Sequence, residues 1–231
     1  MLLTRNIDLK RKVRFKPRKS RKKKYIQTRE VFIGRTYKDF LALHLSTFVE
    51  MDTVISAGDC RKCILTFYFT GSGLFLSYLL NNCTESAVKA AFDRLETIFG
   101  THDFLSLFEV ILTDRGSEFG DPVSLETGTE GIRRTSIYYC DPMSSGQKGG
   151  IEEAHTLLRM VLPKRTVFTD LTQWDLRRIV NHINSYARER LNGKTPYQCA
   201  LEAFGEKVLS ALQLRPIHPD EVTLTPKLLK K

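Results

Sequence analysis

Long apolar stretches are missing from this sequence. No run approaches the roughly 20 apolar residues that a membrane-spanning helix needs, and the opening residues, Met1 to Arg5, contain no apolar signal-peptide segment. The five cysteines are odd in number and scattered in spacing, which indicates free thiols in a reducing compartment rather than a disulfide framework. A GxxxxGK[ST] phosphate-binding loop is also missing, which argues against ATP-driven chemistry. We therefore expect a cytoplasmic protein that has no membrane partner.

Basic charge is concentrated near the N-terminus. The 36 Lys and Arg residues exceed the 26 Asp and Glu residues by 10, and residues 1–30 contain 13 of the basic residues but only 2 of the acidic ones. A basic run of this kind binds the phosphate backbone of DNA without reading its sequence, and Phe15 and Tyr25 lie among the charges as stacking groups. The alternative is a solvated tail that aids solubility. The DNA contacts that we expect in this arm are Lys22, Lys23 and Lys24.

Apolar periodicity predicts a mixed α/β domain. Apolar runs at 48–55, 63–69 and 74–80 predict an antiparallel meander, because a Gly-Ser-Gly turn separates the last two. Two further strands are expected at 110–113 and 136–140, and helices at 36–43, 84–99, 151–162, 172–192 and 197–211. This order is typical of a ribonuclease H-like fold, in which helices flank a mixed five-stranded sheet. We expect an arm and connector at 1–47, a core at 48–205 and a tail at 206–231.

Three acidic residues stand at positions in the predicted strands and helices where a carboxylate could bind a metal ion. Asp52 lies inside an apolar strand, where an unpaired carboxylate is costly. Asp114 follows a strand directly, at the end where ligands gather in α/β sheets, and Glu152 opens a helix. The ordinary alternatives are a strand-edge side chain that faces water, a turn residue and a partner of the helix dipole. Together, three carboxylates suit two Mg²⁺ or Mn²⁺ ions about 4 Å apart, which can act on a phosphate group.

The helix expected at 151–162 carries more polar groups on one face. Glu152, His155 and Arg159 are spaced i, i+3 and i+7, which places them on the same side. Glu153 is a competing acid, but it points about 100° away around the helix. This face either presents an acid, an imidazole and a guanidinium to one substrate or is an ordinary solvated surface.

Five motifs follow one another between about residues 45 and 205. They are VEMDTVI at 49–55, ILTDRGSEF at 111–119, YCDPMSSGQKG at 139–149 followed by Glu152, His155 and Arg159, HINSYAR at 182–188, and LNGKTP at 191–196. In this order they resemble the DDE transposase and retroviral-integrase superfamily, and in particular the insertion-sequence thirty family of bacterial transposases. The resemblance implies an integrase-type catalytic core that cleaves DNA and transfers strands during transposition.

The resemblance also implies roles for individual residues. Asp52, Asp114 and Glu152 would be the catalytic triad and would bind two Mg²⁺ or Mn²⁺ ions. The DNA contacts of the core would be Arg159, His155 and Lys148. The expected partner is double-stranded DNA, both transposon ends and target, with the protein assembled as a homo-oligomer on it and associated with a bacterial nucleoid.

The chain departs from the family pattern at three points. Arg115 and Gly146 stand where the family usually has Asn and Trp. The helix-turn-helix segment that usually precedes the core is not in this chain, from which we expect a truncated copy. Two other functions stay open at this point: a metal-dependent nuclease of the same fold that does not join strands, and a catalytically inactive DNA-binding remnant.

Overall fold

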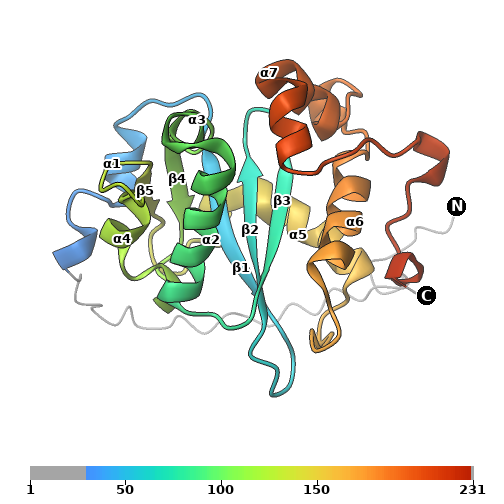
Figure 1. The fold of residues 1–231 in the computed structure, drawn as a ribbon, viewed down its shortest axis with the longest axis horizontal. Helices are drawn as coiled ribbons and strands as arrows, with labels where there is room; N and C mark the ends of the chain where they lie inside the picture. Colours follow the sequence, from blue (N-terminus) through green and yellow to red (C-terminus); the bar gives the residue numbers. More distant parts are fainter. Residues whose placement is uncertain (1–29, 230–231) are drawn as a thin grey trace, which may run out of the picture.

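A five-stranded sheet forms the centre of the computed structural model, which describes residues 30–229 (Figure 1). The strands are Val49–Ile55 (β1), Cys63–Phe69 (β2), Phe75–Leu80 (β3), Val110–Thr113 (β4) and Ser136–Tyr139 (β5). They lie in the order β3-β2-β1-β4-β5, with β1 to β3 antiparallel, β4 parallel to β1, and β5 parallel to β4. This confirms the predicted mixed sheet. The candidate arm residues Lys22, Lys23 and Lys24 lie outside the described residues.

Helices cover both faces of the sheet, with α2 in front and α5 behind in Figure 1. The α-helices are Tyr37–Leu41 (α1), Glu85–Phe99 (α2), Thr101–Leu107 (α3), Pro122–Glu126 (α4), Gly149–Val161 (α5), Gln173–Asn184 (α6) and Pro196–Ala211 (α7). None of the helices in residues 30–229 is both long enough and apolar enough to cross a membrane.

The position of β2 inside the sheet explains why residues 63–69 form a continuous apolar run. All seven of its residues are buried, because β2 lies inside the sheet and both of its faces are covered. Strand β1 is buried over its first three residues and then becomes partly exposed at Asp52 and Thr53. Asp52 is thus a partly exposed position within the central strand, between the buried Met51 and Val54.

The edge strand β3 is protected by side chains of α6. The amide of Asn184 accepts a hydrogen bond from the Phe75 backbone N–H (2.9 Å) and donates one to the Phe75 carbonyl (2.8 Å). Gln173, at the other end of α6, pairs in the same way with the Leu79 N–H (2.7 Å) and the Ser77 carbonyl (3.0 Å). These amides satisfy backbone groups that would otherwise be open to another strand.

The helix predicted at 172–192 is shorter than expected. It ends at Asn184, and Asn192 instead ends a separate 3₁₀ turn, Glu189–Leu191 (η5), with a left-handed backbone (φ 55°). The prediction was wrong because the apolar pattern continues to Ala187 and no Gly or Pro before Gly193 marks the earlier end. The chain after Asn184 instead turns back toward α5, where Arg188 contacts Glu153.

Candidate active site

Two aspartates lie side by side, one on β1 and one at the end of the neighbouring strand β4. The parallel register, with Glu50 opposite Leu112, brings Asp114 alongside Asp52. The Asp52 carboxylate accepts a hydrogen bond from the Thr53 N–H (2.7 Å), and the Asp114 carboxylate accepts one from the Gly116 N–H (3.0 Å) in a tight turn. The pairing of two strands distant in sequence thus gathers two of the three predicted acids.

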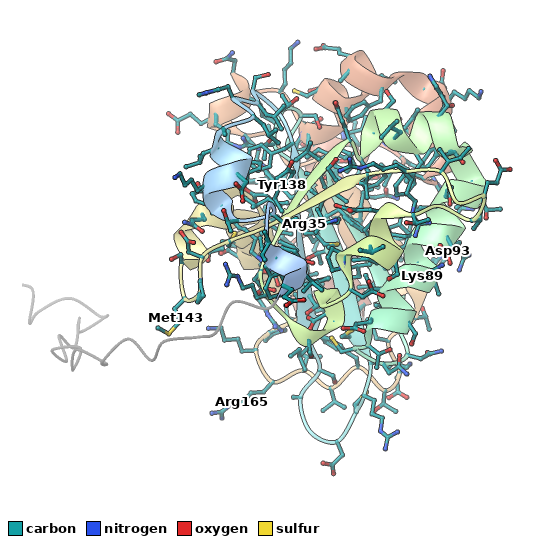
Figure 2. The ribbon with its side chains drawn as sticks, turned by 90° about the vertical axis from the view of Figure 1, so that its left-hand side faces the viewer. Arg35, Lys89, Asp93, Tyr138, Met143 and Arg165 are labelled. Carbon is teal, nitrogen blue, oxygen red and sulfur yellow. The ribbon has the colours of Figure 1, made fainter. Side chains whose placement is uncertain are left out.

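An open pocket of about 360 Å³ brings the third acid into the same place. Asp52, Asp114 and Glu152 all line it, together with Arg115 and the loop that precedes α5. Met143, also in the lining, is 82% exposed and projects from the surface at the rim (Figure 2). The pocket therefore opens to solvent beside three carboxylates from β1, the end of β4 and the first turn of α5.

The start of α5 is fixed against the sheet by Glu50 and Tyr68. Glu50 is only 3% exposed, and its carboxylate accepts a hydrogen bond from the Ile151 N–H (2.5 Å) in the first turn of the helix. Such a carboxylate satisfies a backbone donor that the helix leaves unpaired and complements the helix dipole. Gly150 lies so close to Tyr68 that an added Cβ would be 2.1 Å from the ring. Both contacts fix the helix that carries Glu152.

Glu152 and Glu153 differ in their surroundings. Glu152 lines the pocket with the two aspartates. The Glu153 carboxylate instead contacts Arg188 Nη1 (3.1 Å) and Arg190 Nε (3.8 Å). The two neighbouring acids therefore point to different partners, as the 100° rotation per residue of a helix requires.

Lys148 is a buried cation between the two aspartates. Its side chain is 4% exposed, and Nζ lies 3.0 Å from Asp52 Oδ2 and 3.5 Å from Asp114 Oδ2. The ammonium also donates a hydrogen bond to the Met51 carbonyl (3.2 Å). Its charge is thus directed at the carboxylates, and its role as a DNA contact stays a prediction.

Arg115, which stands where the resembled family usually has Asn, lies against an aromatic ring. Its guanidinium carbon is 5.1 Å from the centre of the Phe32 ring, a distance that permits a cation–π contact. Gly146, which stands where that family usually has Trp, has room for a larger side chain, because a Cβ added there would meet no atom within 4 Å.

His155 connects α5 to the backbone of Asp52. Its Nε2 lies 2.9 Å from the Thr66 hydroxyl, which donates its own proton to the Asp52 carbonyl (2.9 Å). His155 Nε2 therefore donates the hydrogen bond to the Thr66 oxygen. Burial holds the pKa of His155 at about 4, below the ordinary 6.5. Arg159, one turn further along α5, is half-buried, and burial lowers the pKa of its guanidinium.

Acid is expected to destabilise the protein through His155. The folded state binds this proton less readily than the unfolded state, so the stability is complete above about pH 6.5 and decreases as the pH falls toward 4. At pH 5 the loss from this residue should be about 2 kcal/mol relative to pH 7. Urea unfolding at both pH values, for wild type and His155→Gln, measures it. Equal pH dependence of the two proteins would contradict the assignment.

Comparisons with known proteins bear on the family. No family model matches this sequence. ORF3 of Spiroplasma virus SpV1-R8A2 B, which is named as an integrase, is 32% identical over 145 residues, covering 63% of this chain and 42% of that protein. Transposase InsI of element IS30A from Escherichia coli K12 is 33% identical over 100 residues, covering 42% of this chain and 25% of the transposase. Over part of its length, this chain is thus similar in sequence to an insertion-sequence transposase and to a viral protein named as an integrase. This chain spans less than half the length of either of these two proteins.

A solved structure shares the fold of this chain. A chain of the simian T-cell lymphotropic virus intasome, solved in complex with PP2A regulatory subunit B56 gamma, matches with a TM-score of 0.50 at 16% identity. The match covers 66% of this chain and 53% of the other. At this level of identity the likeness concerns the fold, and it agrees with the mixed sheet and its flanking helices.

Glu50, which fixes the start of α5 beside the pocket, was not identified from the sequence, and Lys148 was identified only as a DNA contact. Glu50 carries a weak signal, since it is a second acid in an apolar strand, two residues from Asp52 and therefore on the same face. No signal in the sequence indicates the contact of Lys148 with Asp52, because these residues are 96 positions apart. Only the folded chain brings them together.

The donors in the pocket suit a divalent cation by type, since carboxylate oxygens are the ligands that Mg²⁺ and Mn²⁺ prefer. Within residues 30–229, no group of three or more His, Cys, Asp or Glu side chains is close enough together to hold a metal ion. Lys148 supplies the positive charge to Asp52 and Asp114 instead. The donor set thus fits such an ion by chemical type.

Proposed function

We propose that this chain contains the catalytic core of a DDE transposase, which cleaves DNA and transfers strands with the help of divalent metal ions. The observation that carries the proposal is the gathering of Asp52, Asp114 and Glu152 around one open pocket. The sequence similarity to transposases and integrases supports it. In this proposal the core covers residues 48–205, with an arm and connector at 1–47 and a tail at 206–231.

Each side chain has a part in the proposed reaction. Asp52, Asp114 and Glu152 would hold two Mg²⁺ or Mn²⁺ ions, which when bound supply Lewis acidity to the attacking and leaving oxygens of a phosphodiester. Thr53 and Gly116 orient the aspartate carboxylates through backbone N–H groups. The pocket is open to solvent, so a DNA strand can reach the carboxylates from outside.

DNA is the partner that this function requires. Arg159 and His155 lie on the same helix face as Glu152 and would bind the strand near the scissile phosphate. The basic residues Lys22, Lys23 and Lys24 would contact the phosphate backbone without reading its sequence. Assembly as a homo-oligomer on DNA is part of the same proposal, because joining two ends to one target needs more than one active site.

A strand-transfer assay tests the proposal. Labelled duplexes with free 3′-hydroxyl ends, taken from the DNA that flanks the gene, are incubated with the full chain, target plasmid and Mg²⁺. We expect joined product with the wild type and none with Asp114→Asn. Cut target without joined product would indicate a nuclease, and DNA binding with neither product would indicate an inactive remnant.

A further inference from the structure

The Lys148 ammonium holds a position that a divalent cation would be expected to take. We infer that Lys148 is an internal counter-ion of the Asp52–Asp114 pair, and that a metal ion binds to this pair only by displacing it. The inference rests on the proposed function, because it takes the two aspartates to be metal ligands. It assigns Lys148 a role in setting metal affinity.

The contacts of Lys148 are those of a bound cation rather than of a surface lysine. Its three acceptors, an oxygen from each aspartate and the Met51 carbonyl, lie between 3.0 and 3.5 Å from Nζ. An ammonium has three N–H donors, so these three oxygens can use all of them. The Lys148 side chain is 4% exposed and that of Asp52 22%, so water screens this contact only in part, whereas the Asp114 side chain is 50% exposed and its contact is screened more.

Arg115, the other basic residue that lines the pocket, is not the counter-ion of the two aspartates. Arg115 directly follows Asp114, but its guanidinium carbon lies 5.1 Å from the centre of the Phe32 ring. Lys148 is thus the basic side chain that the structure places on both aspartates, and without it two like charges would face each other across neighbouring strands.

Lys148 is also placed to connect metal binding with the start of α5. It is the last residue of a 3₁₀ turn, Ser145–Lys148 (η4), and the residue before α5, four positions from Glu152. The turn is held by paired hydrogen bonds between Gln147 and Asp141 (2.8 and 3.0 Å), at an exposed part of the chain. Withdrawal of Lys148 would free the aspartate oxygens at the edge of the pocket that Glu152 lines.

Mn²⁺ binding to the full chain, measured without DNA by electron paramagnetic resonance of the free ion, tests this inference. We expect Lys148→Met to bind Mn²⁺ at least tenfold more tightly than the wild type, because the ion no longer competes with an ammonium. Lys207→Met removes an exposed lysine of α7 and should leave the affinity within about twofold. Asp114→Asn should weaken binding in both backgrounds, which locates the ion at the pocket.

Thermal unfolding provides a second measurement. Without metal, Lys148→Met should unfold at a lower temperature than the wild type, and Mn²⁺ should raise its Tm by more than it raises that of the wild type. If the methionine variant does not fold, Lys148→Gln, which can still donate to the Met51 carbonyl, should show the same tighter binding.

The outcomes separate this inference from the proposed function. Equal or weaker Mn²⁺ binding by the Lys148 variants, with wild-type binding still dependent on Asp114, would overturn the role of Lys148 and leave the proposed metal site in place. Failure of the wild type and the Lys148 variants alike to bind Mn²⁺ would overturn both.

Discussion

Replacing Arg134 by methionine is expected to lower the free energy of unfolding by about 3–5 kcal/mol. The Arg134 side chain is fully buried, and Nη1 contacts Asp93 Oδ1 (2.7 Å) and Glu96 Oε2 (3.0 Å) on α2. Its Nε donates to the Leu125 carbonyl of α4 (2.8 Å). Without the guanidinium, the carboxylate of Glu96, which is 3% exposed, would lose its counter-ion inside the protein.

The neighbouring arginine is a matched control. The Arg133 side chain is 65% exposed, and its contact with Glu126 is long (4.0 Å). Arg133→Met should therefore change the stability by at most about 1 kcal/mol. Guanidinium unfolding curves of both variants make the comparison. A loss of less than about 1 kcal/mol in Arg134→Met would contradict the view that this buried cation joins α2, α4 and the segment before β5.

Glu152→Gln is expected to reduce strand transfer by about a thousandfold or more. In the proposed function it removes a charged metal ligand, whose Lewis-acid contribution is several kcal/mol, and each tenfold change in rate corresponds to about 1.4 kcal/mol. The overall fold should be unchanged, because Glu152 is an exposed residue on the first turn of α5.

Glu153→Gln is the control for this prediction, since it makes the same chemical change at the next residue. Glu153 contacts Arg188 and Arg190 rather than the pocket, so strand transfer should stay within about tenfold of the wild type. Single-turnover rates with excess protein measure both variants. If Glu153→Gln lost activity and Glu152→Gln kept it, the third acid would have to be reassigned.

Much of the fold could be predicted from local patterns. The continuous apolar run of β2 matches a strand buried on both faces. The helix predicted at 84–99 ends where expected, because Gly100 follows it with a positive φ of 77°. Such features depend on residues that are neighbours in sequence. For this reason the positions of the strands along the chain and most helix bounds follow from periodicity alone.

The candidate acids could also be selected from the sequence, because their positions relative to strands and helices are local properties. Asp114 follows the last residue of β4, and Glu152 lies in the first turn of α5, as expected. Their roles stay proposals, but the structure places both with Asp52 at one pocket.

Only the tertiary structure determines which cation lies beside the aspartates of this pocket and which residue fixes the helix that carries Glu152. The contact of Lys148 with Asp52 and that of Glu50 with the start of α5 join residues about a hundred positions apart. The side chain of Asn184, at the end of α6, pairs with the edge of β3, more than a hundred positions earlier. A buried charge or an open backbone group requires a partner, but the sequence does not specify which distant residue supplies it, because that follows only from how strands and helices come together.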